Sequence, residues 1–148
     1  MDVTAGTAFV LEGHALVAGE AAGQLLVASE PLSFWGGYDA DTGEIIDRRH
    51  ALSGLNANGR ILAIPSTRGS STTSAVLLEA IRAGKAPAAI LTSEVDAFLA
   101  LAPIVAGEMY QSALPVVALR PEDFSRLRSG VRATVERSGR VRVGVGPV

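Results

Sequence analysis

The alternation of apolar and polar residues predicts short strands at both ends of the chain. Residues 8–29 contain three apolar runs, separated by small residues where Gly13, Gly19 and Gly23 mark turns. Near the other end, "VRATVE" and "RVRVGV" alternate on either side of "RSG", which is the pattern of a β-hairpin. Both ends of the chain are therefore expected to form antiparallel strands.

The centre of the chain has the pattern of a strand, a helix and a second strand. Residues 59–66 form a compact apolar run, and residues 71–83 place their apolar side chains on one helical stripe. Gly84 and Pro87 mark the end of that helix, and residues 88–92 form the next apolar run. Short joints between these elements indicate a right-handed βαβ unit.

The same pattern repeats once before the C-terminal hairpin. Ser93 can cap a helix over residues 93–107, which Pro103 should kink or end, and "LPVVALR" is the third strand of the layer. A short helix beginning at Pro121 then leads into the hairpin. No linker or internal repeat divides residues 1–148. The sequence therefore predicts a single α/β domain, with a βαβ centre and flanking antiparallel strands.

Composition narrows the possible functions. The net charge of −2 argues against nucleic-acid binding, which needs a basic footprint. Residues 120–148 nevertheless carry seven arginines and three acids, so this end is either a docking face or a solvated hairpin. The chain has no cysteine and can supply no disulfide, thiol nucleophile or cysteine ligand for iron. We expect a cytoplasmic protein without a membrane span, because no targeting segment and no apolar run of about 18 residues is present.

The most distinctive polar stretch is "TRGSSTTS", which joins the apolar run at 59–66 to the predicted helix. The first turn of a helix exposes backbone N–H groups and partial positive charge, so it can bind phosphate or carboxylate. Gly69 lets the backbone approach a ligand, and Arg68 offers a fork that fits a carboxylate. Five hydroxyl side chains run from Ser70 to Ser74. One hydroxyl would suffice as a cap, so this density favours a ligand site over a simple helix cap.

Several other kinds of site lack support in the sequence. The joint has neither the spacing of a nucleotide P-loop nor a G-x-G-x-x-G dinucleotide loop, and no G-x-S-x-G elbow occurs. His14 and His50 lie far apart and outside any H-x-x-x-H pattern. We therefore expect no metal site on this chain.

Three blocks of the chain resemble the small subunit, or swivelling domain, of aconitase X. They are "PLSFWGGYDADTGEIID", "RGSSTTSAVLLEAIRAGKAPAAIL" and "ALAPIVAGEMYQSALPVV", which occur in this order within about residues 29–119. The resemblance implies the swivelling β/β/α domain of the aconitase superfamily. It also implies a heterodimer, in which this domain closes over a large subunit to form the active site. The large subunit would carry any iron or iron–sulfur cluster, and this chain would bind no cofactor.

The resemblance also implies roles for residues in the joint. In aconitase-like enzymes a serine of this joint removes the proton next to a carboxylate, and Ser70 holds that position here. Arg68, Gly69, Ser71 and Thr72 would then shape the site and hold a small carboxylate substrate. A serine can act as a base only where donors and positive charge stabilise its alkoxide, which a helix N-terminus can do. Aconitase has an arginine where Thr72 stands, so the substrate should differ from citrate.

Aconitase X enzymes are hydro-lyases. The resemblance implies dehydration of cis-3-hydroxy-L-proline to a pyrroline-2-carboxylate, as in bacterial forms, with phosphomevalonate dehydration, as in archaeal two-subunit forms, as the alternative. A non-catalytic subunit that caps its partner, or an independent anion-binding domain, is also compatible with these residues.

A second group of residues is expected to contact the large subunit. "SFWGG" has the composition of an exposed loop, in which Phe34 and Trp35 would pack on the partner, although both could equally belong to the core. Arg48 and His50 are weaker candidates for the same interface.

Overall fold

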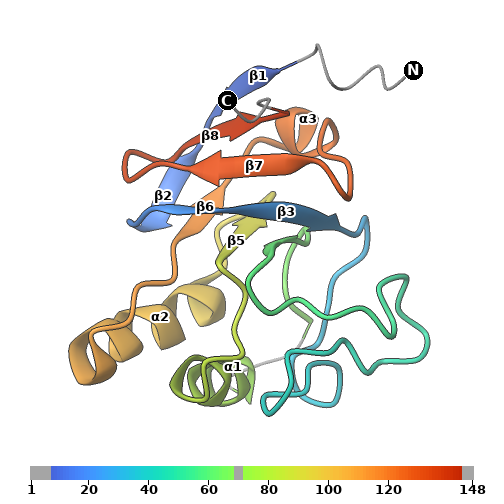
Figure 1. The fold of residues 1–148 in the computed structure, drawn as a ribbon, viewed down its shortest axis with the longest axis vertical. Coiled ribbons are helices and arrows are strands. Elements are labelled where there is room, and N and C mark those ends of the chain that lie inside the picture. Colours follow the sequence, from blue (N-terminus) through green and yellow to red (C-terminus); the bar gives the residue numbers. More distant parts are fainter. Residues whose placement is uncertain (1–7, 69–71, 145–148) are drawn as a thin grey trace.

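The computed structural model describes residues 8–68 and 72–144 of the 148-residue chain. Within these ranges eight strands form one sheet in the order β1-β8-β7-β3-β4-β5-β6-β2 (Figure 1). The strands are β1 (Phe9–Glu12), β2 (His14–Val17), β3 (Ala21–Val27), β4 (Ile61–Ala63), β5 (Ala89–Thr92), β6 (Val116–Ala118), β7 (Arg132–Val135) and β8 (Arg140–Val143). The helices are α1 (Thr72–Arg82), α2 (Ala97–Tyr110) and α3 (Pro121–Phe124).

The centre of the sheet is parallel, as the sequence predicts. Strands β3, β4, β5 and β6 are neighbours and run in the same direction. Helix α1 connects β4 to β5, and α2 connects β5 to β6. Figure 1 shows both helices below the sheet, side by side on the same side of it. The predicted βαβ unit is therefore confirmed, and it occurs twice.

Antiparallel strands flank this centre on both sides and curl the sheet. Strand β3 pairs with β7 through Ala21–Gln24 and with β4 through Leu25–Val27. Strands β1 and β2 occupy opposite ends of the strand order, yet only Gly13 separates them in the chain. A Cβ at Gly13 would lie 2.3 Å from Cγ1 of Val117, so only glycine fits where the chain passes from one edge to the other.

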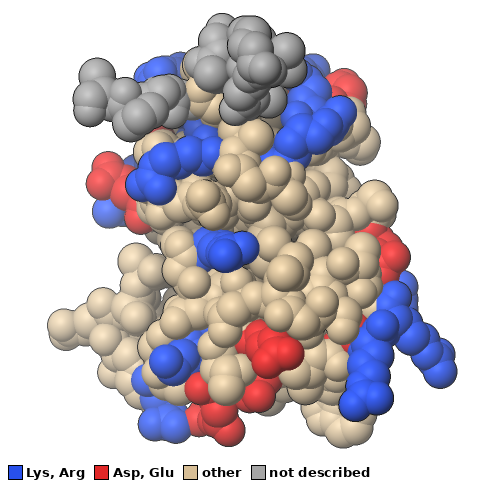
Figure 2. All heavy atoms as spheres, turned by 45° about the vertical axis from the view of Figure 1, so that its right-hand side comes forward, with Lys and Arg blue, Asp and Glu red and all other residues tan. Residues whose placement is uncertain are grey.

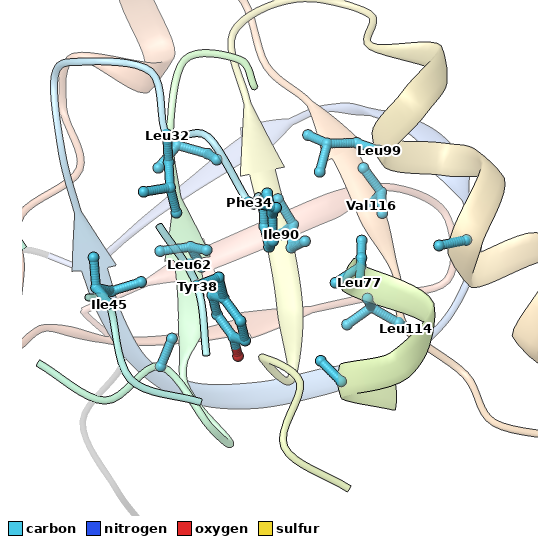
Figure 3. Packing of buried hydrophobic residues seen from close by; sticks show 14 of the residues in the cluster. Leu32, Phe34, Tyr38, Ile45, Leu62, Leu77, Ile90, Leu99, Leu114 and Val116 are labelled. Atoms are coloured by element: carbon cyan, nitrogen blue, oxygen red, sulfur yellow. The ribbon is translucent and has the colours of Figure 1, made fainter. Parts of the chain in front are cut away.

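Alternate residues of the parallel strands face two separate cores. Leu25 points into the space enclosed by the curled sheet, and Leu26 points towards the helices. The enclosed core includes Leu11, Ile61, Leu91, Val117, Phe124, Val135 and Val141. The helix-side core, part of which Figure 3 shows, includes Leu32, Phe34, Ile45, Leu62, Leu77, Ile90 and Leu99. Two β layers and one helical layer are the β/β/α arrangement that the resemblance implies.

The second helix differs from the sequence-based expectation at both ends. Its N-cap is Asp96, whose Oδ1 accepts hydrogen bonds from the backbone N–H groups of Phe98 (3.1 Å) and Leu99 (3.3 Å). The prediction that Ser93 caps the helix is therefore wrong. Pro103 does not end it either, since α2 continues to Tyr110. A proline removes one backbone donor from the helix ladder, and the buried side chains around it keep the helix on the sheet.

Three arginines of residues 120–148 contact other side chains of this chain. Arg140 donates to the Glu12 carboxylate (3.0 Å), Arg142 pairs with Glu136, and the guanidinium of Arg126 lies 4.1 Å from the ring centre of Phe9. On the face in Figure 2, basic side chains form small separate groups, several of them beside acids. These contacts favour a solvated hairpin that also holds β1 in place. No helix in the described part of the chain is long and apolar enough to span a membrane.

Candidate functional site

The joint singled out in the sequence lies where β4 leads into α1. Gly69, Ser70 and Ser71 lie outside the described residues, but the structure describes both flanks. Arg68 is exposed, and its backbone N–H donates to the carbonyl of Leu32 (3.0 Å). Thr72 is exposed at the first position of α1. The joint thus follows the carboxyl end of a central parallel strand and opens a helix, where anions bind in many α/β folds.

One carboxylate ties the joint to the second helix. Oδ2 of Asp96 accepts hydrogen bonds from the backbone N–H of Thr67 (3.0 Å) and from the Thr67 hydroxyl (2.6 Å). Its other oxygen caps α2, as described above. Hydrogen bonds to a charged acceptor are stronger than neutral ones, and a carboxylate is also stabilised at a helix N-terminus. Asp96 therefore fixes the residue two positions before Gly69 relative to the helical layer.

Further hydrogen bonds hold the same region. The Ser93 backbone N–H donates to the carbonyl of Pro65 (3.1 Å), and the Ser74 hydroxyl donates to the carbonyl of Phe98 (3.1 Å). Thr73, in the first turn of α1, has a buried side chain. Two of the five consecutive hydroxyl residues thus serve packing and helix contacts. The density of hydroxyls in the sequence therefore overstates the number that could meet a ligand.

Asp96 is a residue of this site that the sequence patterns do not identify. The sequence pattern predicts Ser93 as the cap of this helix, whereas Asp96 is the cap. An Asp directly before an apolar helical run is a capping signal that could have identified it. Its second role, the contact with Thr67, joins residues 29 positions apart and leaves no local trace in the sequence.

A pocket of about 440 Å³ adjoins the joint at the carboxyl ends of β3, β4 and β5. It is lined by Val27, Ala28, Ser29, Pro65, Ser93, Pro121, Phe124, Ser125, Leu127 and Arg128. Among the described residues that line it, one is basic and none is acidic. Arg128 is held locally, because it donates to the carbonyls of Ser125 (2.7 Å) and Leu127 (2.8 Å).

The two aromatic residues of "SFWGG" have opposite environments. Phe34 is fully buried and stacks on Tyr38, with ring centres 5.2 Å apart and planes at 28° (Figure 3). The prediction that Phe34 packs on a partner is therefore wrong, because its side chain fills the helix-side core. Trp35 is 68% exposed and remains a candidate for that interface.

Arg48 and His50 differ in the same way. Arg48 is exposed and remains a candidate. His50 is buried: Nδ1 accepts a hydrogen bond from the backbone N–H of Leu52 (3.1 Å), and Nε2 lies 3.7 Å from Oε1 of Glu30. Nε2 has no hydrogen-bond partner among the described residues. The prediction that His50 faces the large subunit is wrong, because the ring is enclosed by its own loop.

The residues of this chain do not fit an iron–sulfur cluster. Cysteine, the usual ligand, is absent from the sequence. Among residues 8–68 and 72–144, no three His, Asp or Glu side chains gather where they could hold a metal ion. An iron centre used by an assembly of this domain would need ligands from another chain or segment.

Comparisons of this chain with known proteins all point to the same family. The family model of the aconitase X swivel domain matches residues 10–143. The chain is 54% identical over 112 residues to a cis-3-hydroxy-L-proline dehydratase of Pseudomonas aeruginosa, which covers 76% of this chain and 19% of that enzyme. It is 37% identical over 126 residues to a phosphomevalonate dehydratase small subunit of Thermococcus onnurineus, covering 85% of this chain and 91% of that subunit.

The fold agrees with that of a solved structure. Aconitase X of Thermococcus kodakaraensis, in its holo-form, matches with a TM-score of 0.82 and 32% sequence identity, covering 91% of this chain and 98% of the other. The chain spans only about a fifth of the Pseudomonas dehydratase but nearly the whole Thermococcus subunit. From the matched family model, the sequence identities and the shared fold, this chain belongs to the aconitase X swivel-domain family.

Proposed function

We propose that this chain is the small subunit of an aconitase X hydro-lyase that dehydrates cis-3-hydroxy-L-proline. The observation that carries the proposal is the 54% identity to the Pseudomonas enzyme named for that reaction, against 37% to the phosphomevalonate subunit. A Hypocrea jecorina enzyme of the same name is 45% identical over 116 residues. Both hydroxyproline dehydratases therefore have a higher sequence identity to this chain than the Thermococcus phosphomevalonate dehydratase subunit has.

Ser70 is the proposed base. Its Oγ takes the proton from the carbon next to the substrate carboxylate, and the released electron pair forms the double bond to the neighbouring carbon. The hydroxyl on that carbon leaves as water, with a proton supplied from outside this chain. The resulting enamine isomerises to a pyrroline-2-carboxylate. A serine needs an environment that favours its alkoxide, and the N-terminus of α1 directly after the joint offers partial positive charge.

The flanks of the joint support this role. Thr67 is held by Asp96 and by the Leu32 segment, so the chain enters the joint from a fixed position. Arg68 follows with an exposed side chain that could meet the substrate carboxylate. Gly69 and Ser71 would approach the substrate through their backbone, and Thr72 would do so from the first position of α1.

The assembly is proposed to be a heterodimer with an aconitase X large subunit. This chain supplies a base and an anion-binding joint, whereas the general acid, most of the substrate pocket and any iron or iron–sulfur centre belong to the large subunit. Trp35 and Arg48 are the proposed contacts on the loop between β3 and β4, because both are exposed. The isolated chain should therefore be inactive.

Phosphomevalonate dehydration is the second candidate. It is favoured by one observation: the match extends over 91% of the length of the Thermococcus small subunit. A capping subunit without chemistry would share the fold and the partner. It would differ in that substitution of Ser70 would leave turnover nearly unchanged.

Co-expression with the aconitase X large subunit of the same genome tests the substrate. The purified complex is offered cis-3-hydroxy-L-proline and 5-phosphomevalonate separately, and product is followed by mass spectrometry. The proposal predicts loss of water from the proline alone. Turnover of phosphomevalonate alone would replace the substrate and keep the assembly. The small subunit assayed by itself is the control, and dehydration by it would refute the dependence on the large subunit.

A further inference from the structure

The outer face of α2 is apolar, although a surface helix normally turns polar side chains towards water. Between Val95 and Gly107 the only charged residue is Asp96. Within the described part of the chain, six of the ten exposed large apolar side chains lie between residues 95 and 110. Four of these are spaced three residues apart and are termed the α2 stripe: Val95, Phe98, Leu101 and Ile104.

The stripe is one of two apolar sides of the same helix. Leu99, Ala102 and Ala106 are buried against the sheet and α1. The stripe residues are 70%, 41%, 49% and 52% exposed in chain order. Phe98, Leu101 and Ile104 are helical residues three apart and therefore neighbours, and Val95 extends the row just before the helix begins. Figure 1 shows α2 at the outer side of the helical layer, with α1 on its inner side. A continuous apolar row of this kind is typical of a surface that another protein covers.

The stripe begins at the candidate functional site. Asp96 lies between Val95 and the first turn of α2, and it holds Thr67 at the entrance to the joint. The carbonyl of Phe98 accepts the hydrogen bond from Ser74 of α1. A body that covers the joint at Arg68 would therefore adjoin the first turn of α2. The surface of α1 differs, since it carries the ion pair of Glu79 and Arg82.

We propose that the α2 stripe docks on the large subunit of the aconitase X assembly. This inference rests on the proposed function in one respect: it assumes that this chain assembles with the large subunit. Two relatives support this choice of partner. The Thermococcus relative is named a small subunit, and in the Pseudomonas relative the matched region makes up 19% of a longer chain. The position argues for it as well, because the protein that completes the site must lie over the joint, where the stripe begins. The facing surface of the large subunit would be apolar and free of charge, since burying an unpaired charge against the stripe is costly.

The test is the affinity of the two purified subunits, measured by titration calorimetry. The variant Leu101→Gln/Ile104→Gln replaces two exposed apolar side chains by polar ones of similar size. We expect the dissociation constant to rise at least tenfold while the melting temperature stays close to that of the wild type. Val10→Gln is the matched control: Val10 is 43% exposed on β1, on the side of the sheet away from the helices (Figure 1). It should bind as the wild type does.

The outcomes separate this inference from the substrate assignment. If the double variant does not fold, Val95→Gln, before the helix, gives the same comparison. Wild-type affinity in the folded variants would overturn the inference. The wild-type chain could instead self-associate. If the substitutions abolished that self-association and left binding to the large subunit intact, the stripe would bind a second copy of the chain, and the inference would be overturned. A wrong substrate would leave the complex intact, whereas failure of the wild type to bind the large subunit would refute the assembly and the inference together.

Discussion

Asp96 and Thr67 are joined by two hydrogen bonds, in which the Thr67 backbone N–H (3.0 Å) and hydroxyl (2.6 Å) both donate to Oδ2 of the carboxylate. The other oxygen of the same carboxylate caps α2. A single side chain therefore connects the joint after β4 with the helix that follows β5. Displacing a reacting group by a small distance can lower the reaction rate by orders of magnitude. Because Asp96 fixes the entrance to the joint, we expect it to influence catalysis without contacting the substrate.

Asp96→Asn tests this connection. The amide keeps one oxygen, but its NH₂ group cannot accept hydrogen bonds and the negative charge is lost. We expect the free energy of unfolding to fall by about 1–3 kcal/mol, measured by urea denaturation of the isolated chain. We also expect at least a tenfold loss of kcat in the assembled enzyme, assayed well below its melting temperature.

Asp41→Asn is the matched control for that measurement. Asp41 is an exposed carboxylate in the loop between β3 and β4, and its substitution should change neither quantity. If Asp96→Asn lowered stability but left kcat unchanged, the residue would be a helix cap with no influence on the joint.

Phe34 and Trp35 provide a second contrast. Phe34→Ala empties part of the helix-side core and should lower the free energy of unfolding by about 3–5 kcal/mol. Trp35→Ala removes an exposed side chain and should change it by less than about 0.5 kcal/mol. Trp35→Ala should instead weaken binding to the large subunit. Equal destabilisation by the two substitutions would contradict the packing described here.

Tyr38 should make the protein sensitive to alkaline pH. Its hydroxyl donates to the carbonyl of Lys85 (2.6 Å), and burial raises the pKa of the phenol well above its usual range. In the unfolded chain the phenol ionises near pH 10. Above that pH the unfolded state loses a proton that the folded state keeps. The free energy of unfolding contributed by Tyr38 is therefore fully present below about pH 10 and falls as the pH rises further, by up to about 1.4 kcal/mol per pH unit.

Tyr38→Phe isolates this effect. The variant should be about 1 kcal/mol less stable at neutral pH, because it lacks the hydrogen bond to Lys85. Above pH 10 its stability should fall less steeply than that of the wild type. Parallel curves for Tyr38→Phe and the wild type would show that Tyr38 ionises equally in both states.

Local patterns are sufficient for the layers of this fold but not for its long-range contacts. The apolar runs at residues 59–66 and 88–92 and the helical stripe between them give the βαβ centre, because periodicity reports which face is buried. The division of β3 between two partner strands cannot be read in the same way. It depends on which distant strand lies beside each half, and strand pairing over such separations leaves no local signal.

The candidate site shows the same limit at the level of single residues. The density of polar residues identifies the joint, but Phe34 and Trp35 are neighbours of similar character, and only the packed structure separates the buried ring from the exposed one. His50 is equally ambiguous in the sequence, since burial beneath its own loop depends on contacts with Glu30 and Leu52. Asp96 acts across 29 positions, and its role is found only when the segment after β4 and the start of α2 are seen together in the fold.

The central claim is that Ser70 is the base of a dehydration that this chain performs with its large subunit. The most direct measurement is kcat of the assembled enzyme on cis-3-hydroxy-L-proline, with Ser70→Ala beside the wild type and Ser53→Ala as an exposed-loop control. We predict a loss of about 10²–10⁴-fold for Ser70→Ala, with the complex intact and the control unchanged. Turnover by Ser70→Ala within a few-fold of the wild type would contradict it.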